Sequence, residues 1–127
     1  MNKVLIADDD AAVRAVVRTT LGDEAYEIVE ACDGDEALQL AREHVPDVVL
    51  LDVMMPRRSG LDVCRALKAD PRTSRIVVVM LTGKSLHDER DAGVDVGADA
   101  YFTKPFSPVA LLRRVEDVLH GSGPTGA

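Results

Sequence analysis

The sequence predicts an α/β protein, a doubly wound (βα)5 sandwich in which helices cover both faces of a five-stranded parallel sheet. Short apolar runs rich in Val, Ile and Leu alternate with helix-like segments of about ten residues, as in parallel sheets with helical crossovers. Residues 48–51 and 76–81 are too uniformly apolar for strands with one face in water. The runs are residues 4–7, 27–31, 48–52, 76–81 and 100–103.

The apolar character of each run predicts its place in the sheet. Residues 48–52 and 76–81 belong near the centre, where both faces of a strand are covered. Residues 27–31 are few and flanked by Glu, so they are expected to form an edge strand.

Most of the helices are predicted from capping residues. Asp10 precedes the first helix, and Ser59 precedes the third. Asp33 precedes the second helix, with Glu36 at the spacing of a capping box. Residues 86–96 are expected to form the fourth helix, although they contain Asp, Gly and Val in place of good helix formers.

The last helix is predicted to begin after Ser107, which is followed by Pro at the first helical position. Its apolar residues recur at three or four positions and predict one buried stripe. The stripe is Val109, Leu112, Val115 and Leu119. The predicted domain spans residues 1–120, and the Gly-, Ser- and Pro-containing residues 121–127 are expected to be a flexible tail or linker remnant.

Composition excludes several classes of protein. A chain of 127 residues predicts one domain, and its net charge of −7 argues against nucleic acid or an anionic membrane as a direct partner. The longest apolar run is too short to span a membrane, and Asp8 follows the first run too early for a signal peptide. A cytoplasmic location is therefore predicted. Cys32 and Cys64 are expected to be reduced and buried.

Polar residues follow four of the five predicted strands. In an open parallel sheet, ligands bind at the carboxyl ends of the strands, so these residues are expected to converge on one rim. They are Asp8 and Asp9, then Asp52, then Thr82 and Gly83, and finally Lys104 and Pro105.

This set of side chains suits Mg²⁺-dependent phosphoryl transfer. Mg²⁺ prefers oxygen ligands, and Mn²⁺ is a possible substitute. The carboxylates of Asp8, Asp9 and Asp52 carry three negative charges, which Mg²⁺ and the Lys104 ammonium would balance. A carboxylate beside a divalent ion can attack phosphorus while the cations stabilise charge on the phosphoryl oxygens.

The chain resembles the receiver domain of bacterial two-component response regulators from residue 3 to about residue 120. Four motifs carry the resemblance through their order and spacing: Asp8-Asp9, residues 52–60, residues 81–83 and residues 97–106. It implies a flavodoxin-like fold with strand order 2-1-3-4-5. It also implies that Asp52 is the phospho-acceptor, Asp9 a direct metal ligand and Asp8 a second acid. The backbone carbonyl of Met54 matches a third protein ligand of the metal.

The resemblance also assigns the residues that would bind the phosphoryl group and respond to it. Thr82 matches the switch hydroxyl, Gly83 leaves the phosphoryl pocket open, and Lys104 contacts the phosphate. Tyr101 matches the aromatic that swings inward when Thr82 moves. The Lys104–Pro105 bond is expected to be cis, and Met54 and Lys84 occupy positions that tune the lifetime of the phosphoryl group.

The partners follow from the same resemblance. A histidine kinase or phosphotransfer protein would donate the phosphoryl group. The domain would catalyse only its own phosphorylation and dephosphorylation, and it is otherwise not an enzyme. Its output would be a changed surface of the fourth helix, fifth strand and fifth helix, which docks a protein partner or a second receiver.

Three other functions use a similar fold or a similar set of residues. A haloacid-dehalogenase-type phosphatase would use Asp8 as nucleophile, but Ala12 stands where that family has Thr or Val, and no acidic pair follows Lys104. A flavodoxin-like FMN protein would have a Ser-, Thr- or Gly-rich loop where three aspartates stand, and these would repel the FMN phosphate. A receiver-like scaffold that works without phosphorylation would not need acidic, hydroxyl and lysine side chains at the strand ends, and this chain has all of them.

Overall fold

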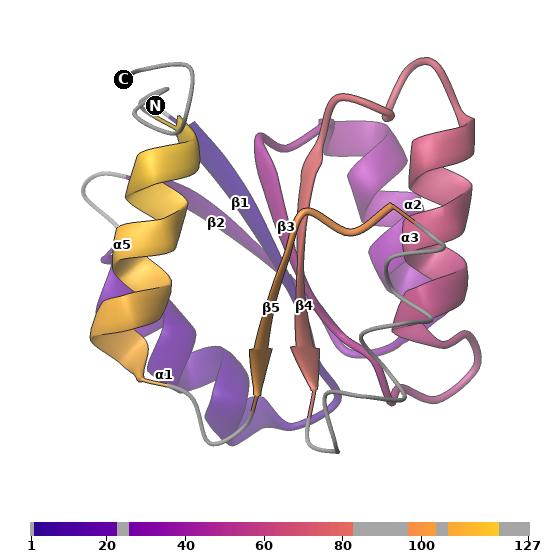
Figure 1. Ribbon diagram of the computed structural model, residues 1–127. Coiled ribbons are helices and arrows are strands. Elements are labelled where there is room, and N and C mark those ends of the chain that lie inside the picture. The colour runs from indigo at the N-terminus through magenta and orange to yellow at the C-terminus, as the bar shows by residue number, and fades with distance from the viewer. Residues whose placement is uncertain (1, 23–25, 83–96, 104–106, 120–127) are drawn as a thin grey trace.

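The computed structural model has a five-stranded sheet with helices on both faces (Figure 1). It describes residues 2–22, 26–82, 97–103 and 107–119. The strands are β1 (Asn2–Ala7), β2 (Tyr26–Ala31), β3 (Val48–Asp52), β4 (Val77–Thr82) and β5 (Ala100–Thr103). The helices are α1 (Ala11–Leu21), α2 (Gly34–His44), α3 (Gly60–Ala69) and α5 (Pro108–Leu119). The predicted fourth helix, residues 86–96, and the predicted tail, residues 121–127, lie outside the described residues.

The strand order is β2-β1-β3-β4-β5, and every neighbouring pair is parallel. This confirms the predicted fold class and the predicted order 2-1-3-4-5. The run 27–31 lies in β2 at an edge, and the two continuous apolar runs lie in β3 and β4, inside the sheet. Every residue of β3 is buried because both of its faces are covered.

The helices divide into two pairs, one on each face of the sheet (Figure 1). Successive strand residues point to opposite faces, so Val49 and Leu51 of β3 pack in the core beneath α2 and α3. Val48 and Leu50 pack in the other core, beneath α1 and α5. This two-sided burial explains why the strands read as unbroken apolar runs.

The predicted capping residues begin the helices. Asp10, Asp33, Ser59 and Ser107 each accept a hydrogen bond from a backbone N–H of the first helical turn. Glu36 reaches back and accepts a bond from the N–H of the residue just before the Asp33 cap. Local sequence therefore places these helix starts, and with them the loops that precede each helix.

The stripe predicted for α5 is wrong at one position. Val109 is 58% exposed, whereas Leu111 and Val115 are fully buried. At 100° per residue, Leu111 and Val115 lie on one face, and Val109 lies about 200° from Leu111 on the outer side. The buried face therefore includes Leu111 in place of Val109. None of the helices in the described part of the chain has the length and apolar composition to cross a membrane.

Candidate functional site

The carboxyl ends of β1 and β3 bring three acidic side chains together. Asp8 follows β1, Asp9 follows Asp8, and Asp52 is the last residue of β3. One carboxylate oxygen from each lies within 4.8 Å of the others. The register explains this, because Ala7 of β1 pairs with Leu51, the residue before Asp52. The predicted convergence of these three acids is thus present.

The three acids differ in exposure. Asp8 is completely buried and Asp52 is 4% exposed, whereas Asp9 is exposed. Asp8 Oδ1 accepts a hydrogen bond from the N–H of Asp10 at 2.9 Å, and Asp52 Oδ1 accepts one from the N–H of Met54 at 3.3 Å. These local bonds orient two carboxylates, and the exposed third one leaves the cluster open to solvent.

The donor set fits a small hard cation. All three side chains offer oxygen, which is the ligand that Mg²⁺ and Mn²⁺ accept most readily. Oxygens bound about 2.1 Å from Mg²⁺ lie about 3 to 4 Å from one another, and the spacing of the cluster comes close to this. Exposed Asp9 would let the ion keep some of its waters.

The backbone at the start of α3 packs closely against the backbone of Asp52 and Val53. The N–H of Gly60 donates to the carbonyl of Val53 at 2.9 Å, and a Cβ on Gly60 would lie 2.2 Å from the carbonyl oxygen of Asp52. Only glycine permits this approach. A glycine at the start of a helix, where better helix formers are available, is a sequence signal for such a close approach.

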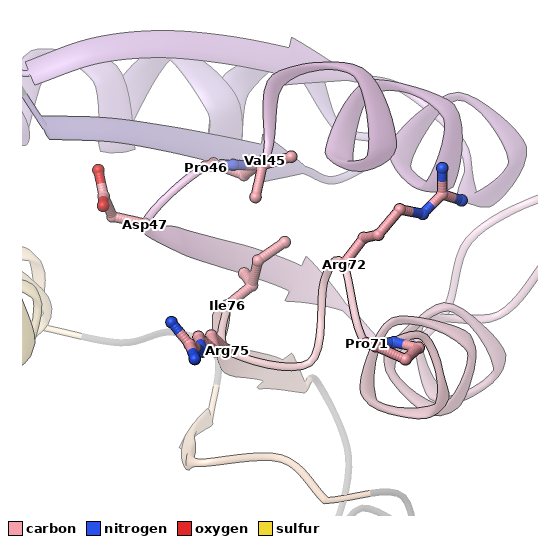
Figure 2. A pocket seen from close by; sticks show the side chains of 7 residues that line it. All are labelled: Val45, Pro46, Asp47, Pro71, Arg72, Arg75 and Ile76. Atoms are coloured by element: carbon pink, nitrogen blue, oxygen red, sulfur yellow. The ribbon is translucent and has the colours of Figure 1, made fainter.

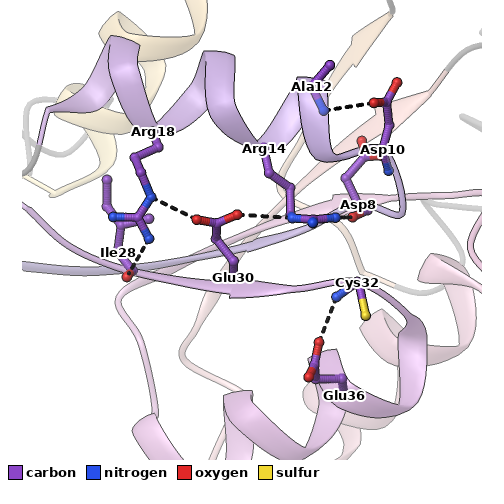
Figure 3. A network of polar contacts seen from close by, with 9 residues as sticks. All are labelled: Asp8, Asp10, Ala12, Arg14, Arg18, Ile28, Glu30, Cys32 and Glu36. Carbon is purple, nitrogen blue, oxygen red and sulfur yellow. Dashed lines mark hydrogen bonds and ion pairs between the residues drawn. The ribbon is translucent and has the colours of Figure 1, made fainter.

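An arginine on α1 binds the backbone of the first acid (Figure 3). Arg14 Nη1 donates to the carbonyl oxygen of Asp8 at 2.6 Å, and Arg14 Nε donates to Glu30 of β2 at 3.0 Å. Arg18, one turn later, donates to the other oxygen of Glu30 at 2.8 Å. The two guanidinium groups lower the pKa of Glu30, with the hydrogen bond from Arg18 as the largest cause. Sequence reasoning missed this network, although a Glu within an apolar strand is a signal for one.

The loop after Asp52 is tied to α2. Arg57 pairs with Asp33 at 3.4 Å, and Arg58 pairs with Asp35 at 3.0 Å. Both arginines are exposed and lie in ion pairs with residues at the start of α2.

Thr82 is the last residue of β4. Its backbone pairs with that of Thr103, at the same end of the sheet as Asp52. The Thr82 side chain lies outside the described part of the chain. Gly83, Lys84, Lys104 and Pro105, with the predicted cis bond, also lie outside the described residues, so their roles stay predictions.

Tyr101 lies in β5, opposite Met80 of β4. The ring is half-buried and packs against the core beneath α2 and α3. Its hydroxyl oxygen is buried. The side chain therefore points inward in this structure, and its predicted movement stays a prediction.

The cysteine prediction is half right. Cys64 is buried, and burial raises the pKa of its thiol to about 11. Cys32 is exposed, contrary to the prediction, because β2 ends at Ala31 and Cys32 belongs to the turn before Asp33. Both side chains are thiols.

A separate pocket of about 420 Å³ lies at the other end of the sheet (Figure 2). Arg72 and Arg75 stand at its sides, and Asp47 stands beside the start of β3 (Figure 2). None of the site residues predicted from sequence lines it. The candidate site is therefore the acidic cluster at the carboxyl end.

Comparison with known proteins gives a consistent match. A family model, "Response regulator receiver domain", matches residues 4–116. The phosphate regulon transcriptional regulatory protein PhoB of Pseudomonas aeruginosa is 41% identical over 121 residues, which cover 95% of this chain and 53% of that protein. The response regulator MprA of a Mycobacterium species is 43% identical over 122 residues, covering 96% of this chain and 52% of that protein. The chain thus spans about half the length of these curated relatives.

Solved structures agree with the sequence matches. The crystal structure of a putative response regulator from Chloroflexus aurantiacus superposes with a TM-score of 0.87 at 34% identity. The alignment covers 94% of this chain and 98% of that one.

Proposed function

Since the chain belongs to the response regulator receiver domain family, whose members are signalling proteins, we propose that it accepts a phosphoryl group on Asp52. The donor is a histidine kinase or a phosphotransfer protein. The observation that carries this proposal is the nearly buried Asp52 carboxylate, within 4.8 Å of those of Asp8 and Asp9. Such an arrangement of like charges is costly without a bound cation, so it points to chemistry rather than to stability.

The residues that hold the metal in this proposal are Asp8, Asp9, Asp52 and the backbone carbonyl of Met54. A bound Mg²⁺, or Mn²⁺ in its place, supplies positive charge that offsets charge on the phosphoryl oxygens. Asp9 is the exposed member of the cluster and the direct ligand. Asp8, which is buried and bonded to the N–H of Asp10, is the second acid.

In the proposed transfer, a carboxylate oxygen of Asp52 attacks the phosphorus of a phosphohistidine. An O–P bond forms, the P–N bond breaks, and the imidazole nitrogen keeps the electron pair. Lys104 and Thr82 bind the phosphoryl oxygens, and Gly83 leaves room for them. In the proposed dephosphorylation, water passes the side chains of Met54 and Lys84 and attacks the same phosphorus. A new O–P bond forms, the bond between phosphorus and the Asp52 oxygen breaks, and inorganic phosphate leaves the restored carboxylate. Met54 is 55% exposed beside Asp52, as this role requires.

The proposed output is a change of surface. Phosphorylation replaces one negative charge with about two and adds acceptor oxygens, which draw Thr82 inward. The Tyr101 ring follows Thr82 and is held in its inward position. The proposed face comprises the fourth helix predicted over residues 86–96, together with β5 and α5; on α5, Val109 is exposed. A protein partner or a second receiver would dock there. The whole chain has a net charge of −7, so the proposed partner is a protein rather than nucleic acid or a membrane. The proposed location is the cytoplasm.

The experiment combines acetyl phosphate, Mg²⁺ and peptide mass mapping. We expect the phosphoryl group on Asp52 and no uptake by Asp52→Asn. Asp62→Asn is the matched control, because Asp62 is an exposed carboxylate on α3 that pairs with Arg65, and it should be phosphorylated like the original protein.

Two of the alternative functions predict different results, in this experiment or in a binding measurement. Phosphoryl on Asp8 would replace the proposal with a phosphatase of the haloacid-dehalogenase type. Failure of calorimetry to detect Mg²⁺ binding would favour a scaffold that works without phosphorylation. Unchanged backbone NMR shifts of β5 and α5 on adding beryllofluoride would contradict the proposed switch.

A further inference from the structure

We propose that Arg14 is a positioning residue for the metal site. Through the backbone carbonyl of Asp8, it fixes the loop that presents the carboxylates of Asp8 and Asp9. This inference rests on the proposed function, because it concerns the same Mg²⁺ site. Arg14 Nη1 lies 2.6 Å from the carbonyl oxygen of Asp8, and its side chain is only 18% exposed.

Hydrogen bonds engage the N–H, the carboxylate and the carbonyl of Asp8, and Arg14 donates the bond to the carbonyl. The N–H of Asp8 donates to the carbonyl of Ala31 at 3.1 Å, beyond the last paired residues of β1 and β2. Its Oδ1 accepts from the N–H of Asp10, which in turn caps α1. The carbonyl is the remaining polar group of the residue. With all three bonded, neither the peptide plane after Asp8 nor the start of Asp9 is free to rotate.

Glu30 keeps the Arg14 guanidinium in place (Figure 3). Its Oε1 accepts from Arg14 Nε at 3.0 Å, and its Oε2 accepts from Arg18 Nε at 2.8 Å. A planar guanidinium held at one nitrogen presents its other nitrogens in fixed directions. Glu30 therefore aims Arg14 at the Asp8 carbonyl.

Arg18 is a matched control within the same network. It binds the same glutamate from the same helix, but its Nη2 donates to the carbonyl of Ile28, in the middle of β2. Both of these partners of Arg18, Glu30 and Ile28, lie on β2. Removing Arg18 thus removes the same charge and an ion pair to the same glutamate, while the bond from Arg14 to the Asp8 carbonyl is retained.

Charge and positioning predict opposite outcomes when Arg14 is removed. On charge alone, loss of a cation close to the cluster should strengthen the binding of Mg²⁺. If Arg14 positions the loop, its loss should weaken Mg²⁺ binding, because residues that orient metal ligands typically contribute 10- to 100-fold to affinity. The sign of the change therefore separates the two roles.

The experiment measures Mg²⁺ dissociation constants by calorimetry for the original protein, Arg14→Ala, Arg14→Lys and Arg18→Ala. We expect about tenfold weaker binding for Arg14→Ala and less than about twofold change for Arg18→Ala. Arg14→Lys retains a donor and should recover part of the loss. In the metal-free proteins, the NMR amide shifts of residues 8–10 should move in Arg14→Ala and stay in place in Arg18→Ala. Thermal unfolding confirms that each variant is folded.

Equal or tighter Mg²⁺ binding by Arg14→Ala would overturn the inference, as would an equal loss in Arg18→Ala. These results leave the proposed function standing, because the original protein still binds the metal. Absence of Mg²⁺ binding by the original protein would instead remove the proposed function, and this inference with it. The NMR shifts then show whether Arg14 holds the loop independently of metal.

Discussion

At the amino end of the sheet, the Lys68 ammonium lies among oxygen atoms. It donates to the carbonyl of Ile76 at 2.7 Å, to that of Ser74 at 3.3 Å, and to Asp99 Oδ2 at 3.1 Å. The same Asp99 oxygen accepts from the N–H of Val78 at 2.8 Å. One ion pair thus joins the end of α3 to the starts of β4 and β5, and each charge faces an opposite charge or a dipole.

At the carboxyl end, charges of the same sign lie together. Asp8 and Asp52 are buried, and with Asp9 they bring carboxylate oxygens within 4.8 Å of one another. Such crowding destabilises the folded state unless a cation is bound. The charges at the amino end of the sheet thus stabilise the fold. The carboxylates at the carboxyl end are unfavourable for stability and are useful only for binding and chemistry.

The largest effect on stability is expected at Lys68. Lys68→Met should lower the free energy of unfolding by about 2 kcal/mol, because it removes charged hydrogen bonds around a partly buried ammonium. Mg²⁺ affinity should not change, since Lys68 lies at the other end of the sheet. Urea unfolding and calorimetry measure the two quantities.

Arg65→Met is the control for Lys68. Arg65 lies on the same helix and makes an exposed pair with Asp62, so its loss should cost less than about 0.5 kcal/mol. A loss of Mg²⁺ binding in Lys68→Met would contradict the separation of the two ends.

The opposite sign is expected at the carboxyl end. In metal-free protein, Asp8→Asn should raise the free energy of unfolding by about 1 to 2 kcal/mol, because it removes one of three adjacent negative charges. The amide oxygen can still accept the bond from the N–H of Asp10. Added Mg²⁺ should then stabilise the variant less than the original protein. Urea unfolding with and without Mg²⁺ tests both statements, and a less stable metal-free variant would contradict the first.

Much of the fold could be predicted from the sequence because its signals are local. The apolar runs predicted the strands to within two residues at either end, and Asp33 and Ser59 predicted helix starts. The prediction that Val109 lies on the buried face of α5 was wrong, because periodicity alone does not say which of two neighbouring sets of apolar residues faces the sheet. Leu111 is buried and Val109 is exposed.

The acidic cluster could be predicted because strand ends of a parallel sheet meet at one edge. The residues that hold the cluster in place could not be predicted, because they act through contacts between segments distant in the sequence. Arg14 meets Glu30 across 16 residues. Gly60 touches the carbonyl of Asp52 only because the loop between them folds back.

A smaller gain in stability is expected at the amino end. Val45 ends α2 in the left-handed region, with φ 44° and ψ 63°, which is unfavourable for a β-branched residue. It is 50% exposed at the rim of the pocket in Figure 2. Val45→Gly should therefore raise the free energy of unfolding by about 1 kcal/mol.

Val45→Ala is the control for this substitution. It keeps a Cβ in the same backbone conformation, so it should gain much less stability than Val45→Gly. Equal gains in both variants would show that exposure of the valine, and not its backbone conformation, sets the effect.

The smallest effect is expected from the titration of Glu30, where opposite charges pair beside the acidic end. Arg18 and Arg14 lower the pKa of Glu30 in the folded protein. The pair therefore contributes stability at pH values above the ordinary glutamate pKa of about 4.3, and this contribution is lost as the pH falls through the lower folded value. Glu30→Gln should remove that part of the acid dependence of stability.

Urea unfolding between pH 7 and pH 3 measures the contribution of Glu30 to the free energy of unfolding. This contribution should be small, because Glu30 is 34% exposed and solvent screens the pair. If the original protein and Glu30→Gln lose stability in parallel over this range, Glu30 binds its arginines no better when ionised. Opposite-charge pairing would then stabilise the amino end of the sheet alone.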